Sequence, residues 1–134
     1  MRFEVIEHTA DAGITAYGDS AAEIFENAAY GMFSLMTDVR NVRPVGEVQV
    51  ELEAHDLGSL LVDWLSELLF IHEAENVFFG EFEAAVEGFR LKAKARGEEV
   101  DPKRHRLQAQ VKAVTYHMLD VNPEEGYATV IFDI

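Results

Sequence analysis

The chain has 134 residues, a mean hydropathy of −0.05 and a formal net charge of −14. Its length fits a single domain covering residues 1–134, and no apolar run approaches the roughly 18 residues that span a membrane. The chain has no cysteine, which excludes disulfides, thiolate zinc sites and a cysteine nucleophile. A surface this acidic repels phosphate backbones and anionic membranes, so we expect a cytoplasmic protein without direct nucleic-acid binding or membrane association. The negative charge can attract a basic protein partner, bind a divalent cation or simply keep the protein soluble.

The first 36 residues predict two strands followed by a helix. Residues 3–5 alternate with polar neighbours, with no apolar signal region before them, and residues 13–17 form a second such run. Ser20 and Glu23 form a capping box, which predicts a helix from residue 21 to about residue 36. Its Met and Phe residues recur at helical spacing, as expected for a face that packs in the core.

The middle of the chain predicts a strand, a second helix and a hairpin. Residues 48–52 alternate as in a strand with one wet face, and Asp56 can cap a helix from residue 57 to about residue 73. Residues 82–86 and 89–95 predict a β-hairpin that turns near Gly88. Glutamates on its first arm face Arg and Lys on its second, so we expect a ladder of cross-strand ion pairs rather than an RNA-binding patch.

The last third predicts strands only. Residues 97–105 are typical of a polar loop, residues 107–119 of one long strand, residues 122–126 of a turn and residues 127–134 of a final strand. Taken together, the elements predict an α+β fold in which two helices pack on a curved sheet or a small sandwich.

Carboxylates gather at two places that are far apart in the sequence. Asp11 lies at the bend between the first two predicted strands, close to Glu7 and His8, where an Asp usually caps backbone N–H groups. At the C-terminus, the carboxylate of Asp133 is one residue from the α-carboxylate of Ile134. These two terminal groups are either both solvated or joined by a cation, and an oxygen-only set suits calcium, magnesium or manganese.

Two basic residues of the predicted strand 107–119 have open roles. Lys112 shares a strand face with Val114 and Tyr116, and it can extend to solvent or present its ammonium to a phosphate or a partner carboxylate. His117 is a candidate ligand or base, or a structural residue. The chain contains no Gly-rich phosphate loop, no zinc-binding His-Glu-x-x-His helix and no Ser-His-Asp order, so no catalytic residue is predicted.

Four segments, "EHTADAGITAYG", "LLVDWLSELLF", "VKAVTYH" and "VIFDI", resemble the archease family in the family's order and over essentially the whole chain. The resemblance implies a six-stranded β-sandwich-like core with two α-helices. It also implies a protein that is not an enzyme but an activator of the RtcB-type RNA ligase, in tRNA splicing and RNA repair. Archeases promote the guanylylation and turnover of that ligase and broaden its use of nucleotides.

The resemblance also implies a set of site residues. It implies a divalent cation, calcium before magnesium or manganese, held by Asp11, Asp133 and the terminal carboxylate of Ile134. Lys112 corresponds to a functional residue on the face that meets the ligase. The residues that match only as near-site positions are Glu7, His8 and His117.

Two other functions stay open on the residues alone. The same cation could activate a water, with His117 or His8 as the base, in a stand-alone metal-dependent phosphoesterase or hydrolase. Alternatively, the acidic surface could belong to a chaperone-like module that binds an RNA-processing protein.

Overall fold

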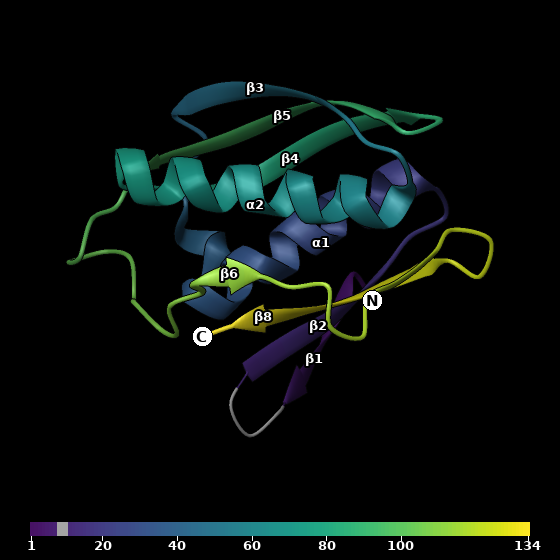
Figure 1. Ribbon diagram of the computed structural model, residues 1–134. Coiled ribbons are helices and arrows are strands. Elements are labelled where there is room, and N and C mark those ends of the chain that lie inside the picture. The colour runs from purple at the N-terminus through teal and green to yellow at the C-terminus, as the bar shows by residue number, and fades with distance from the viewer. Residues whose placement is uncertain (8–10) are drawn as a thin grey trace.

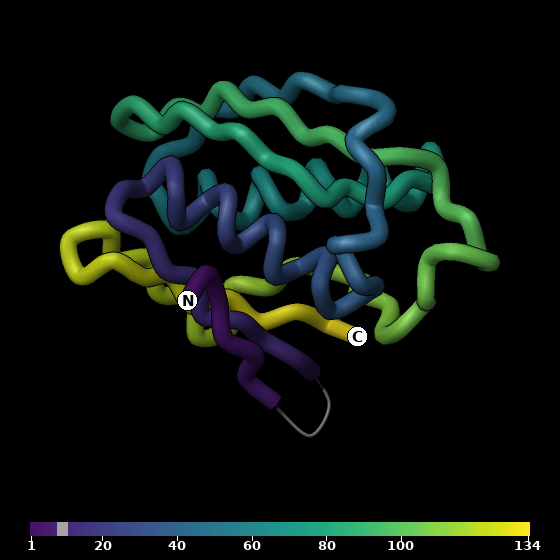
Figure 2. The backbone as a smooth tube through the Cα atoms, turned by 180° about the vertical axis from the view of Figure 1, so that it is seen from behind, coloured from purple at the N-terminus to yellow at the C-terminus, as the bar shows by residue number. Residues whose placement is uncertain are grey.

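Two antiparallel sheets enclose two helices, and this computed structural model describes residues 1–7 and 11–134 (Figure 1). The first sheet has the order β1 (Phe3–Glu7), β2 (Asp11–Tyr17), β8 (Tyr127–Asp133) and β6 (Ala113–Val114), with β7 (Asp120–Asn122) also paired to β8. The second sheet has the order β3 (Gly46–Glu53), β5 (Arg90–Glu99) and β4 (Val77–Glu87). The helices α1 (Ala21–Met36) and α2 (Leu57–Glu75) lie between the sheets, and the view from behind shows the same layers (Figure 2).

The predicted α+β class with two α-helices is confirmed in the described part of the chain. Six of its strands have five or more residues, and the two others, β6 and β7, have two and three. None of the helices in that part of the chain is both long and apolar enough to cross a membrane.

Both helices begin at the predicted caps. The backbone N–H of Glu23 donates to the Ser20 hydroxyl at 3.1 Å, and the backbone N–H of Ser59 donates to Asp56 Oδ1 at 2.7 Å. These bonds satisfy backbone donors that have no partner inside the helix. The local sequence therefore sets where each helix starts.

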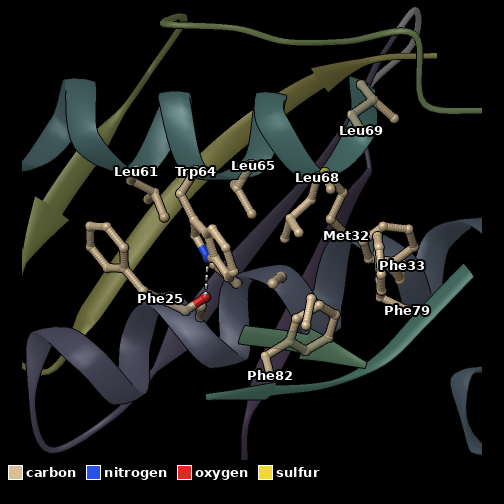
Figure 3. Packing of buried hydrophobic residues seen from close by; sticks show 14 of the residues in the cluster. Phe25, Met32, Phe33, Leu61, Trp64, Leu65, Leu68, Leu69, Phe79 and Phe82 are labelled. Carbon is tan, nitrogen blue, oxygen red and sulfur yellow. Dashed lines mark hydrogen bonds between the residues drawn. The ribbon is translucent and has the colours of Figure 1, made fainter. Parts of the chain in front are cut away.

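The core lies where the helices meet each other and both sheets. Trp64 of α2 is fully buried, and its indole N–H donates to the backbone carbonyl of Phe25 on α1 at 3.0 Å (Figure 3). Phe33 of α1 packs edge-on against Phe79 and stacks with Phe82, both on β4. This packing fixes α1 against the second sheet, while Ile14 and Phe132, also fully buried, face the core from the first sheet.

The predicted hairpin and its ion pairs are confirmed. Glu87 lies opposite Arg90 across the turn at Gly88, whose φ of 59° is a backbone conformation that favours glycine. Arg96 of β5 bonds to Glu47 on β3 at 3.0 Å and to Glu83 on β4 at 2.7 Å. The ladder thus extends over three strands, because the basic strand β5 lies between two acidic ones.

The predicted long strand at residues 107–119 is wrong. The backbone N–H groups of Gln108 and Ala109 donate to the carbonyls of Met36 and Leu35 at the end of α1, so this part of the segment does not join a sheet. Only the two residues of β6 follow a strand, and Met118, with a φ of 54°, lies in a turn. The predicted polar loop at 97–105 also begins too early, because β5 continues to Glu99.

Candidate metal centre at the end of the first sheet

The register of β2 and β8 places Asp11 directly opposite Asp133. Residues opposite each other in an antiparallel pair have Cβ atoms about 4.5–5.5 Å apart, and two like charges in such a pair destabilise it. Oδ1 of Asp11 is shielded from solvent, whereas Asp133 is exposed. The fold therefore joins two carboxylates that are at opposite ends of the sequence.

The other predicted residues lie at the same end of β8. Ile134 follows Asp133 directly and is 42% exposed. The backbone N–H of Lys112 donates to the carbonyl of Asp133 at 2.8 Å, and Ala113 pairs with Asp133 on the side away from β2. Asp11, Asp133, Ile134 and the backbone of Lys112 are thus brought together.

The residues that match the family only as near-site positions are Glu7, His8 and His117, and the strand pairing does not place Glu7 or His117 beside Asp133. Glu7 pairs with Ala12, so the alternation of side chains along β2 directs it to the face opposite that of Asp11. His117 is exposed in the turn after β6, where its backbone N–H donates to the Thr115 hydroxyl. His8 lies outside the described residues. The strand register joins neither Glu7 nor His117 to Asp133.

The donors at this end fit a hard cation. Two carboxylates and an α-carboxylate are all oxygen ligands, the set that calcium, magnesium and manganese prefer. Within the described ranges, no cluster of three His, Asp or Glu residues is arranged to hold a metal ion. In a site here, the α-carboxylate of Ile134 would be available as a third protein donor.

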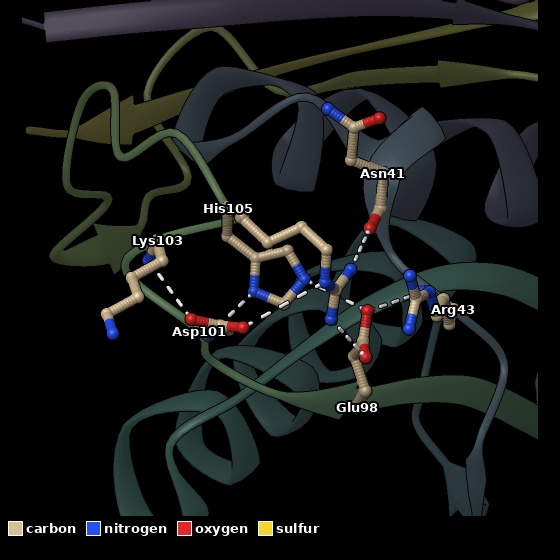
Figure 4. Close-up of polar contacts among 7 residues, drawn as sticks. Asn41, Arg43, Glu98, Asp101, Lys103 and His105 are labelled. Atoms are coloured by element: carbon tan, nitrogen blue, oxygen red, sulfur yellow. Dashed lines mark hydrogen bonds and ion pairs between the residues drawn. The ribbon is translucent and has the colours of Figure 1, made fainter.

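A polar cluster joins the end of β5 to the loop that follows it, and the local sequence did not predict it (Figure 4). Glu98 accepts hydrogen bonds from the Arg104 guanidinium at 2.6 Å, from the backbone N–H of Arg43 at 2.7 Å and from His105 Nε2 at 2.9 Å. His105 is 1% exposed, and its Nδ1 accepts from the backbone N–H of Asp101 at 2.8 Å. The guanidinium of Arg104, helped by the Arg43 and His105 donors, lowers the pKa of Glu98 to about 2.

Comparison with known proteins agrees with this architecture. The model of the "Archease protein family (MTH1598/TM1083)" matches residues 3–134. The chain belongs to the archease family. The archease of Methanothermobacter thermautotrophicus is 44% identical over 138 residues, covering 98% of each chain. The archease of Pyrococcus abyssi is 45% identical over 124 residues, covering 90% of this chain and 87% of its own.

Solved structures of archeases share the fold. The solution structure of Methanobacterium thermoautotrophicum protein 1598 is 42% identical, with a TM-score of 0.84 and 99% of both chains covered. The crystal structure of an archease from Thermotoga maritima, described as a possible chaperone, has a TM-score of 0.62 at 19% identity, with 96% of this chain and 94% of that chain covered. At that identity the second likeness shows the fold alone.

Proposed function

We propose that this protein is a non-enzymatic activator of an RtcB-type RNA ligase in the cytoplasm, acting in tRNA splicing or RNA repair. Its family membership supports an archease function. In this proposal it promotes the guanylylation and turnover of the ligase and broadens the nucleotides that the ligase accepts. The face that contacts the ligase is the end of the first sheet, with a divalent cation, calcium first, held by Asp11, Asp133 and Ile134.

The observation that carries the proposal is the register of Asp11 opposite Asp133. On the second sheet, by contrast, several carboxylates lie opposite Arg or Lys, as Glu87 lies opposite Arg90. A like-charge pair costs free energy, and a bound cation offsets that cost. This is the physical reason to expect a cation at this end of the sheet.

The chain's own groups have separate roles in this scheme. Asp11 and Asp133 hold their carboxylates on rigid neighbouring strands, and the backbone N–H of Lys112 fixes the carbonyl of Asp133 at 2.8 Å. When bound, a dication offsets most of the three negative charges and leaves open positions for water or for oxygen ligands of a partner. The exposed ammonium of Lys112 is available to a phosphate or a carboxylate of that partner.

The test is single-turnover guanylylation of a purified RtcB-type ligase, with and without this protein. We expect the wild type to accelerate guanylylation and Asp11→Ala or Asp133→Ala to remove most of the acceleration. Asp63→Ala, which removes an exposed carboxylate on α2, is the matched control and should stimulate like the wild type. Unchanged stimulation by folded Asp11→Ala and Asp133→Ala proteins would show that the metal face is not the active one.

The same set of proteins separates the two alternatives. A stand-alone hydrolase would release phosphate from nucleotides or phosphoesters without the ligase, and Asp11→Ala would abolish that release. A chaperone-like module would keep the ligase soluble after chelation of the metal as well as before it. The activator proposal predicts neither result.

A further inference from the structure

One segment, which is exposed over most of its length, has the opposite charge to the rest of the chain. Residues 102–119 contain no Asp or Glu, and they include Lys103, Arg104, Arg106 and Lys112, four of the 11 basic residues in a chain of net charge −14. No other stretch of this sequence runs as long without an acidic residue. This segment is therefore basic, although the chain as a whole is acidic.

Two of these four basic side chains form no ion pair within the described residues. Arg104 is bound to Glu98, but no carboxylate of residues 1–7 or 11–134 forms an ion pair with the side chains of Lys103 or Arg106. Both residues are exposed, and Figure 4 shows the Lys103 ammonium pointing away from the polar cluster. Leu107, directly after Arg106, is 60% exposed. The segment thus presents two free cations beside an apolar side chain.

The polar cluster holds this segment in place. His105, which lies between Lys103 and Arg106 in the sequence, is buried and bonds to Glu98 on β5. The Arg104 guanidinium donates to the carbonyl of Asn41 at 2.7 Å. Residues 102–112, which form no helix or strand, are consequently anchored near their start by these hydrogen bonds. Such anchoring lowers the entropy lost when exposed side chains bind a partner.

The segment also adjoins the candidate metal centre. It contains Lys112, whose backbone N–H donates to the carbonyl of Asp133. Figures 1 and 2 show the loop before β6 (green) projecting at the side of the molecule on which the C-terminus lies. A partner that contacts the metal centre can therefore reach the segment at the same time.

We propose that Lys103, Arg106 and Leu107 form a second docking contact for the ligase, and that they bind an acidic surface with an apolar pocket at its centre. This inference rests on the proposed function. A protein fits better than RNA for two reasons: the exposed Leu107 has no complement on a phosphate backbone, and a net charge of −14 opposes the approach of RNA. Opposite charges at the edge of such a contact speed association and make it sensitive to salt.

The experiment measures both the affinity for the ligase and the guanylylation rate at saturating protein. Lys103→Glu/Arg106→Glu should weaken binding at least tenfold near 0.1 M salt, less at 0.5 M, and leave the saturated rate unchanged. Leu107→Ser should weaken binding several-fold at both salt concentrations. The matched control is Lys92→Glu/Lys94→Glu on β5, which makes the same charge change on the other sheet and should alter affinity less than twofold.

Each remaining outcome has a distinct meaning. Equal affinities for the two double variants would overturn the docking contact while the proposed function stands. Binding of a fluorescent single-stranded RNA by the wild type, lost in Lys103→Glu/Arg106→Glu with ligase affinity intact, would assign the surface to RNA and overturn it too. A wild-type protein that neither binds nor stimulates the ligase would overturn the proposed function, and this inference with it.

Discussion

The two sheets of this protein differ in the charges that strand pairing places opposite each other. On the second sheet, acidic β3 and β4 flank basic β5, so Glu47, Glu83 and Glu87 lie beside Arg or Lys partners. At the end of the first sheet, the strand register puts Asp11 opposite Asp133. Since antiparallel pairing favours opposite charges and disfavours like ones, the first arrangement stabilises the fold by itself. For the second, we propose that a bound cation offsets the repulsion.

The largest effect is expected at Glu98, which pairs with Arg104 and whose side chain is 10% exposed. Its pKa is lowered from 4.5 to about 2, so its contribution to stability is present above pH 4.5 and is lost as the pH falls toward 2. A shift of this size corresponds to roughly 3 kcal/mol of unfolding free energy. Denaturant unfolding between pH 6 and pH 2.5 should show this loss in the wild type.

The matched variant for this prediction is Glu98→Gln. It should be less stable than the wild type at pH 6, and the difference should shrink as the pH approaches 2.5. A difference that is constant across this pH range would mean that the Glu98 charge does not stabilise the cluster.

The next effect concerns the two carboxylates that lie opposite each other, Asp11 and Asp133. Asp133→Asn leaves the size of the side chain unchanged but removes one anionic ligand, and we expect calcium affinity to fall by about 100-fold, equivalent to roughly 2.7 kcal/mol. Isothermal titration calorimetry measures this directly. Asp63→Asn, the control on α2, should bind calcium like the wild type. Equal affinities for the two variants would exclude Asp133 as a ligand.

A change in the main chain tests the third donor. Adding one glycine after Ile134 moves the terminal carboxylate by about 3.5 Å without altering any side chain. We expect calcium affinity to fall about tenfold while the thermal midpoint without metal stays the same. If the extended chain binds calcium with the wild-type affinity, the terminal carboxylate is not a ligand.

The smallest expected effect is a change in stability whose sign depends on calcium. Without metal, Asp133→Asn removes a like-charge repulsion and should raise stability by a few tenths of a kcal/mol. With saturating calcium the same variant should be less stable than the wild type. Glu83→Gln removes a partner of Arg96, whose guanidinium lowers the pKa of Glu83, so it should lower the thermal midpoint with or without calcium.

Local patterns were sufficient to predict the elements whose signals lie within a few residues. Ser20 and Asp56 mark the helix starts, and the alternation of charges around Gly88 predicted the hairpin with its ion pairs. Residues 107–119 also alternate, but the backbone of Gln108 and Ala109 bonds to the end of α1 instead of to a strand. That choice depends on tertiary contacts that no local pattern contains.

The candidate site was predictable only in part. The residue types at Asp11 and Asp133 are compatible with solvated carboxylates or turn caps, and it was the family resemblance that joined them. Their pairing comes from the register of β2 against β8, which spacing along the chain does not reveal. The burial of His105 against Glu98 was likewise hidden, because both residues lie in stretches whose composition is typical of an exposed loop.

The central claim is that one cation joins the two strands at Asp11 and Asp133. Anomalous scattering from crystals soaked in manganese, a hard cation with the same preference for oxygen ligands, tests it most directly. We expect an anomalous peak within about 2.5 Å of carboxylate oxygens from Asp11, Asp133 and the Ile134 terminus. Crystals that show no peak there, while manganese binds elsewhere on the acidic surface, would contradict it.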